Sequence, residues 1–96
     1  MNLELSPRAI REAERRDRWW RENRRGAPTL FQEELRGALA QIQREPESGR
    51  PYQAKSGREF YRVRTRRTLC YVYYEIRRKG IRVVALWSAV RPEPRL

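Results

Sequence analysis

The sequence has no histidine and only one cysteine, Cys70, among its 96 residues. A single cysteine cannot form an intramolecular disulfide, and without histidine it completes neither an ordinary zinc site nor a Cys–His nucleophile pair. We therefore expect Cys70 to be a buried apolar residue in a reducing compartment, and we expect no metal site.

Long apolar runs are also absent. No stretch approaches the ~20 apolar residues that cross a bilayer, and the first ten residues lack the apolar run of a signal peptide. Apolar residues make up 39% of the chain. A chain of this length forms one domain whose thin core leaves little room for a cofactor. These features predict a cytoplasmic protein with a single domain (residues 1–96), no membrane association and no cofactor.

Lysine is scarce, so the positive charge is carried almost entirely by arginine. The 23 basic residues outnumber the 12 acidic ones, and the formal net charge is +11. Residues 1–48 hold ten basic and nine acidic residues, whereas residues 49–96 hold thirteen and three. Such an asymmetry predicts a polyanionic partner: a nucleic acid, an acidic protein segment or an anionic membrane. Arginine favours forked recognition of phosphate or carboxylate and stacking on bases.

The N-terminal residues predict a short strand followed by a helix. Residues 2–5 alternate apolar and charged side chains, and Ser6 before a proline is typical of a helix N-terminus, which predicts a helix over residues 7–23. One face of this helix carries the apolar residues Ile10, Ala13 and Trp20. We expect Trp20, not Trp19, to face the core, because the two side chains are about 100° apart on a helix.

A second helix is predicted from about Pro28 to Arg44, after the break at Gly26. Its apolar residues follow the helical period: Phe31, Leu35, Ala38, Leu39 and Ile42. Pro46 stops it, and the composition of residues 46–57 indicates a loop. Two helices joined by a short turn predict an antiparallel helical hairpin.

After this loop the apolar period changes to two, which predicts three strands. They cover residues 60–66, 68–76 and 81–88, with a tight turn at 77–80, and the tail of residues 89–96 is expected to leave the sheet. The predicted fold is α+β, in the order β-α-α-β-β-β, with the helical hairpin on one face of a small, mostly antiparallel sheet.

The strand pattern also predicts which side chains share a face. We expect Tyr61 and Val63 to face the core and Arg62, Arg64 and Arg66 to line the uncovered face as a cradle for a polyanion. In the last strand the alternation groups Ile81, Val83, Ala85 and Trp87. The second helix is expected to pack on Val63, Val72, Tyr74 and either Val83 or Val84.

The order of these elements and their landmark residues resembles the RelE/ParE superfamily of toxins from bacterial type II toxin–antitoxin systems. The landmarks span nearly the whole chain: Trp19-Trp20-Arg21-Glu22-Asn23, Phe31 to Ile42, Gly49-Arg50-Pro51-Tyr52, Arg66-Arg67-Thr68, Tyr71-Val72-Tyr73-Tyr74 and Val84-Ala85-Leu86-Trp87. The resemblance implies a toxin that is neutralised by an acidic antitoxin wrapped around it. RelE-like members cleave mRNA on the ribosome, whereas ParE-like members inhibit DNA gyrase.

The resemblance to the mRNA-cleaving branch implies roles for particular residues. Its basic residues correspond to Arg62, Arg64 and Arg91, and a further basic position is Tyr71 here. The C-terminal Tyr or His of that branch has no counterpart after Trp87. Because arginines stay protonated, the proton transfers of cleavage would fall to Tyr71, Tyr73 or Glu75.

These residues leave three functions open. The favoured one is ParE-like inhibition of DNA gyrase; the alternatives are a RelE-like ribosome-dependent mRNA endonuclease and a non-toxic nucleic-acid-binding module. The expected target-binding residues are Arg62, Arg64, Arg66, Arg67, Tyr73, Trp87 and Arg91. Arg66 and Arg67 have an alternative role as anchors for antitoxin carboxylates, and Glu75 an alternative role as a solvated sheet residue.

Overall fold

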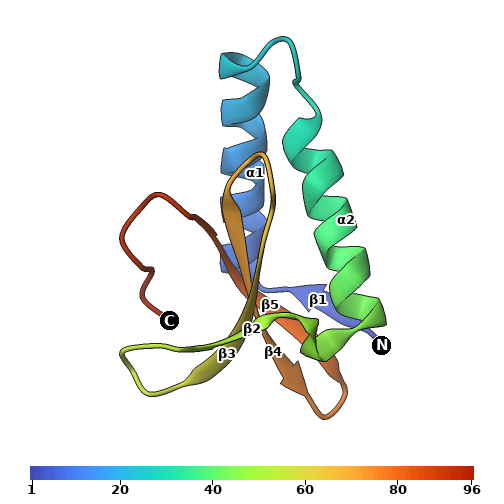
Figure 1. The fold of residues 1–96 in the computed structure, drawn as a ribbon, viewed down its shortest axis with the longest axis vertical. Coiled ribbons are helices and arrows are strands. Elements are labelled where there is room, and N and C mark those ends of the chain that lie inside the picture. The colour runs from blue at the N-terminus through green and yellow to red at the C-terminus, as the bar shows by residue number, and fades with distance from the viewer.

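The computed structural model describes all 96 residues, which form two helices beside a twisted five-stranded sheet (Figure 1). The elements in chain order are β1 (Leu3–Leu5), α1 (Pro7–Asn23), α2 (Leu30–Arg44), β2 (Arg50–Gln53), β3 (Glu59–Arg64), β4 (Cys70–Arg77) and β5 (Gly80–Ser88). A 3-10 turn, Pro46–Ser48, lies between α2 and β2. The helices form the expected antiparallel hairpin.

The strand order across the sheet is β1-β5-β4-β3-β2. β1 is parallel to β5, and every other neighbouring pair is antiparallel. The α+β fold with a helical hairpin on a mostly antiparallel sheet is therefore confirmed. The prediction of a loop over residues 46–57 is wrong in part, because β2 lies within it and pairs with β3. Pro51 is tolerated there because β2 is an edge strand, where one backbone N–H need not be paired.

α1 begins at Ser6, whose side chain accepts a hydrogen bond from the Ala9 N–H at 3.1 Å. The predicted choice between the tryptophans is confirmed: Trp20 packs against the core, while Trp19 is 45% exposed. The prediction for Ile10 is wrong, since Ile10 is exposed and its neighbour Ala9 is buried in its place. A small residue allows the first turn of α1 to lie close to β5.

α2 packs on the sheet as predicted. Phe31, Ala38 and Ile42 are buried, and Leu35 and Leu39 are half-buried against the same cluster. The sheet contributes Val72, Tyr74 and Val83 to this core, with Val63 at its margin, whereas Val84 does not belong to it.

A β-bulge in β5 changes which of its residues face the helices. Tyr73 pairs with Ala85 but Tyr74 pairs with Val83, so Val84 is an extra residue in β5. Ile81 and Val83 therefore face the core together with Leu86. The predicted grouping of Ile81, Val83, Ala85 and Trp87 on one face is thus wrong, because a bulge shifts the alternation by one residue. Ser6 secures the bulge, since its N–H donates to the Val83 carbonyl at 2.9 Å and its hydroxyl to the Val84 carbonyl at 3.0 Å.

The C-terminal tail leaves β5, as expected, but then folds back against the sheet. The Trp87 indole N–H donates to the Pro92 carbonyl at 2.7 Å, and the Ser56 hydroxyl donates to the Leu96 carbonyl at 3.0 Å. On this face, opposite the helices, Phe60 and Tyr73 are 3% and 1% exposed. The face predicted to be uncovered is therefore covered by the tail in part.

The turn between β3 and β4 is held by α2. β3 ends at Arg64, so Arg66 and Arg67 lie on the turn, and the prediction that Arg66 continues the strand face is wrong. The Glu34 carboxylate accepts hydrogen bonds from the Thr68 N–H at 2.8 Å and from the Arg67 N–H at 3.0 Å. These bonds hold the turn against α2, because they direct the backbone donors of Arg67 and Thr68 toward the helix.

Candidate target-binding surface

The strand pairing brings most of the predicted site residues into one row. Arg62 is opposite Tyr73 and Arg64 is opposite Tyr71, and Tyr71 is in turn opposite Trp87 on β5. Because directly opposed residues share a face of the sheet, these five side chains lie on the face away from the helices. We call this row, together with Tyr52 and Arg91, the basic–aromatic face.

Arg62 is enclosed by tyrosine rings. Its guanidinium carbon lies 4.1 Å from the centre of the Tyr71 ring and 5.0 Å from that of Tyr52. One guanidinium N–H also donates to the Tyr73 hydroxyl at 3.4 Å. Cation–π contacts of this kind stabilise a guanidinium by about 0.5–2 kcal/mol each. Arg62 is consequently held against the sheet.

Arg64 is exposed and borders a hollow of about 390 Å³ between the end of α2 and strands β2 and β3. Arg50, Arg62 and Tyr71 line the same hollow. Gln41 of α2 provides an amide beside these guanidinium groups. The hollow therefore combines three positive charges with forked N–H donors, which suits a phosphate or a carboxylate.

The tail adds Arg91 to the basic–aromatic face. Its guanidinium carbon lies 4.3 Å from the centre of the Trp87 ring. Further along the tail, the Tyr52 hydroxyl donates to the Glu93 carboxylate at 2.9 Å. The half-buried Trp87 thus lies between Arg91 and Tyr71 and extends an aromatic surface across three strands and the tail.

Two predicted site residues, Tyr73 and Glu75, expose little of their side chains to solvent. Tyr73 is buried, so the prediction that it touches a target is wrong, and its hydroxyl serves to position Arg62. Glu75 is not a solvated residue, because its side chain is only 16% exposed and pairs with both Arg58 and Arg77. Arg66 and Arg67 are exposed, but on the β3–β4 turn beyond the end of the strand.

Two tyrosines of this face, Tyr52 and Tyr73, have pKa values above the ordinary value of a tyrosine. Burial raises the pKa of Tyr52 to about 12, and the hydrogen bond to Glu93 adds to this effect. Burial also raises the pKa of Tyr73, against the opposing effect of Arg62. Both hydroxyls are therefore neutral at physiological pH. The predicted burial of Cys70 is confirmed, and burial raises the pKa of its thiol to about 11.

Sequence reasoning missed Arg50 and Tyr52, because it assigned their segment to a loop. The residues Arg50 and Tyr52 are two apart, which is the spacing of a strand face. This spacing was the only sign of a strand in the segment. The segment is too short for that sign to outweigh the surrounding Pro, Gly and Ser residues, which indicate a loop.

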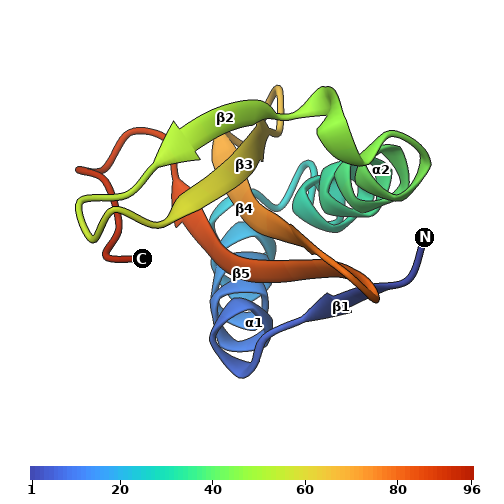
Figure 2. The same cartoon turned by 90° about the horizontal axis from the view of Figure 1, so that it is seen from below.

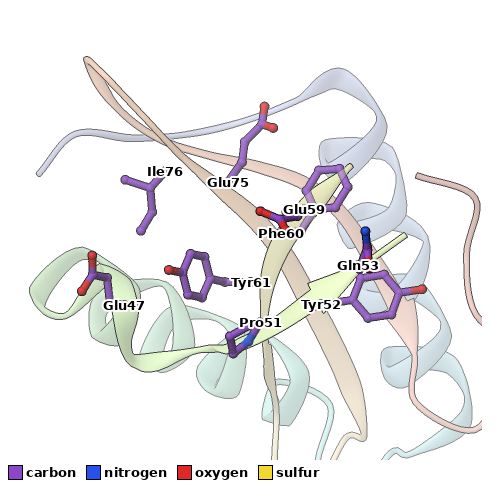
Figure 3. A pocket seen from close by; sticks show the side chains of 9 residues that line it. All are labelled: Glu47, Pro51, Tyr52, Gln53, Glu59, Phe60, Tyr61, Glu75 and Ile76. Atoms are coloured by element: carbon purple, nitrogen blue, oxygen red, sulfur yellow. The ribbon is translucent and has the colours of Figure 1, made fainter. Parts of the chain in front are cut away.

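A hollow of about 630 Å³ lies near the opposite end of β2 and β3 and has a different character (Figure 3). Three of its lining residues are the glutamates Glu47, Glu59 and Glu75. The side chains of Phe60 and Tyr61 project to opposite sides of β3, so the hollow extends around the edge of the sheet. Its acidic lining does not suit a phosphate, and none of the predicted target-binding residues borders it.

No group of three or more His, Cys, Asp or Glu side chains is placed to hold a metal ion. Neither helix has the length and apolar character needed to cross a membrane.

The family model of the ParE toxin of type II toxin–antitoxin systems matches residues 3–92. The chain therefore belongs to the ParE toxin family, within the RelE/ParE superfamily that its sequence resembles. It is accordingly the toxin of a type II system, whose partner is an antitoxin. No match to a curated protein was found.

Proposed function

We propose that this toxin stops growth by binding DNA gyrase through the basic–aromatic face and inhibiting it, without cleaving RNA. The cognate antitoxin carries an acidic segment that covers the same face. This antitoxin chemistry follows from the charge of residues 49–96, which hold thirteen basic and three acidic residues.

The observation that carries the proposal is the enclosure of Arg62. A nuclease arginine must reach the scissile phosphate and stabilise the charge that develops there. Arg62 instead lies against the rings of Tyr52 and Tyr71 and donates to the Tyr73 hydroxyl. An arginine held in this way makes a rigid binding surface, since its position is already set before a partner arrives.

The surrounding groups also favour binding over proton transfer. General acid–base catalysis works best when the pKa of the catalytic group is near the working pH. Tyr52 and Tyr73 have raised pKa values because they are buried. The Glu75 carboxylate pairs with Arg58 and Arg77, neither of which lies in the row with Arg62.

A RelE-like endonuclease is the second candidate, and the hollow beside Arg64 favours it. Three arginines and the Tyr71 side chain line this hollow, and a phosphate group fits such a set of donors. A non-toxic nucleic-acid-binding module is the third possibility that the experiment must address.

The test compares the wild type with the triple variant Arg62→Ala, Arg64→Ala, Arg91→Ala. After induction, mRNA 5′ ends are mapped, and purified protein is added to a gyrase supercoiling assay. A control variant removes three exposed arginines from α1 and so makes the same change in net charge: Arg11→Ala, Arg15→Ala and Arg18→Ala.

We expect the wild type to inhibit supercoiling and to cause DNA breaks and a damage response without codon-phased mRNA cuts. The triple variant should inhibit supercoiling several-fold more weakly than the wild type, because it removes three arginines of the proposed binding face, whereas the control should inhibit as the wild type does. Codon-phased cuts that disappear in the triple variant would overturn the proposal, because losing one electrostatic donor costs a nuclease about 10²–10³-fold. If the wild type neither inhibits supercoiling nor cuts mRNA, the remaining function is that of a non-toxic nucleic-acid-binding module.

A further inference from the structure

A second group of arginines converges around Glu75, toward the end of the sheet where β4 turns into β5. Figure 2 shows this end of the sheet, where the β4–β5 hairpin lies beside β1. These arginines line a hollow of about 340 Å³ and come from five separate segments: Arg8 of α1, Arg58 before β3, Arg77 of β4, Arg82 of β5 and Arg95 of the tail. Glu75 is the only acidic residue that lines this hollow. Nothing in the family assignment or in the basic–aromatic face accounts for this convergence.

Glu75 holds two of these arginines in place. Its carboxylate lies 3.0 Å from an Arg58 Nη2 atom, and the Arg77 Nε–H donates to it at 2.8 Å. Arg58 also lies over the Phe60 ring, at 5.0 Å from the ring centre. Because each guanidinium has five N–H donors, these contacts orient the two side chains and leave other donors free.

The remaining arginines of the hollow have weaker partners. Arg82 pairs with Glu4 at 3.0 Å, but the Glu4 side chain is 64% exposed. Such a surface ion pair contributes about 0–1 kcal/mol. Arg8 pairs with Glu12 at 3.2 Å and also donates to the Arg95 carbonyl at 2.6 Å, which fixes the tail beside the hollow.

The positive surface continues around the tip of the β4–β5 hairpin. Arg77 and Arg82 also line an adjoining hollow of about 540 Å³, together with Arg78 and Lys79. Arg78 and Lys79 are exposed and form no ion pair. The second basic surface thus consists of seven residues: Arg8, Arg58, Arg77, Arg78, Lys79, Arg82 and Arg95.

Arg8 joins this surface to the basic–aromatic face, because its guanidinium carbon lies 5.8 Å from the centre of the Trp87 ring, which Arg91 also contacts. Most of the surface nevertheless lies well away from Arg64. Arg58 precedes β3 and Arg64 ends it, so the two positions are about 20 Å apart at the rise of a β-strand.

The seven cations are paired with only three carboxylates, those of Glu4, Glu12 and Glu75, which leaves four positive charges in excess. This excess favours binding of an external anion, and basic groups spread over about 20 Å of one sheet suit an extended polyanion better than a small one.

We propose that the second basic surface binds the phosphate backbone of DNA. Contacts to the backbone need positively charged forked donors and little apolar area. A docked protein segment would need an apolar centre, and the aromatic residue of this hollow, Phe60, is only 3% exposed. The toxin therefore holds DNA along the second basic surface, which adjoins the basic–aromatic face at Trp87.

The experiment measures fluorescence anisotropy of a labelled, random-sequence DNA duplex with the purified full-length toxin across a series of salt concentrations. The test variant is Arg58→Gln, Arg78→Gln, Arg82→Gln, and the matched control is Arg11→Gln, Arg15→Gln, Arg18→Gln. A second test variant, Arg78→Gln with Lys79→Gln, leaves every ion pair of the fold intact and serves if the first does not fold.

We expect the triple test variant to bind DNA at least ten times more weakly at about 0.1 M salt, and its salt slope to fall by about 2–3, at about 0.9 per lost phosphate contact. The double variant should lose up to two such contacts. The proposal is overturned if test and control variants weaken binding equally, because net charge alone then explains it. It is also overturned if the test variants lose affinity for the antitoxin and not for DNA. No gyrase is present, so this result does not depend on the proposed target.

Discussion

The link between α2 and the β3–β4 turn depends on the carboxylate of Glu34. It accepts hydrogen bonds from the Thr68 N–H and hydroxyl at 2.8 and 2.7 Å, and from the Arg67 N–H at 3.0 Å. Burial raises the pKa of Glu34, but the hydrogen bonds from Thr68 and Arg67 outweigh burial, and the pKa lies below its ordinary value of 4.5. The ionised form is therefore the one that stabilises the fold.

Replacing this residue by Glu34→Gln keeps its size and removes its charge. Hydrogen bonds to a charged group contribute about 1.5–3 kcal/mol, and glutamine retains one acceptor oxygen. We therefore expect the free energy of unfolding at pH 7, measured in urea, to fall by about 1–3 kcal/mol.

The pH dependence gives a sharper test of the same reasoning. Because the pKa of Glu34 is lower in the folded state than in the unfolded state, its contribution is complete above the unfolded pKa. That contribution is lost as pH falls through the folded pKa. The difference in stability between wild type and Glu34→Gln should thus be constant at pH 6–7 and shrink below pH 4.5.

The matched control is Glu33→Gln, one residue away and exposed. Its carboxylate accepts a single hydrogen bond, from Thr29 at 3.3 Å, and the change should cost less than about 0.5 kcal/mol. Equal effects at the two positions, or a Glu34→Gln deficit that persists unchanged at pH 3, would refute the assignment of Glu34 as the ionised cap of the turn.

Three further changes test the packing around the site. Tyr74→Phe removes a hydroxyl that forms hydrogen bonds with two backbone groups of the segment before β2. The free energy of unfolding, measured in urea, should fall by about 2–4 kcal/mol. The control Tyr61→Phe, which removes a hydroxyl without a hydrogen bond, should leave that free energy nearly unchanged. Because burial raises the pKa of Cys70 to about 11, its thiol should react with a disulfide reagent at pH 8 only after unfolding; rapid reaction of the folded protein would contradict its burial. Trp87→Phe removes the indole bond to the tail, so NMR relaxation should show greater backbone mobility at Glu93, Arg95 and Leu96 and not in β4; unchanged mobility of the tail would show that this bond does not hold it.

The periodicity of the apolar residues was sufficient to predict which side chains are buried where burial depends on position along a single helix. The spacing of Phe31, Ala38 and Ile42 predicts the buried face of α2, because a helix repeats every 3.6 residues. The same geometry separates Trp20 from Trp19. The helical period wrongly predicted that Ile10 is buried, because the apolar face of α1 is short and interrupted by charged residues.

The basic–aromatic face could be predicted in composition but not in geometry. Alternation places Arg62 and Arg64 on one side of their strand, and the charge of the C-terminal half indicates a polyanion. Whether a guanidinium is free or enclosed depends on which strand lies beside it. Tyr52 encloses Arg62 only because β2 pairs with β3.

By itself, then, the sequence determined the helical hairpin, the antiparallel strands and the uneven charge of this ParE-family toxin, because these follow from local periodicity and composition. Tertiary structure alone decided the bulge at Val84, the return of the tail to Trp87 and Ser56, and the convergence of Arg58, Arg77 and Arg82. Each of these brings together residues from separate strands or from the tail. Their positions are set by strand register and by hydrogen bonds between distant segments. The periodicity of residue types along the chain contains no information about either.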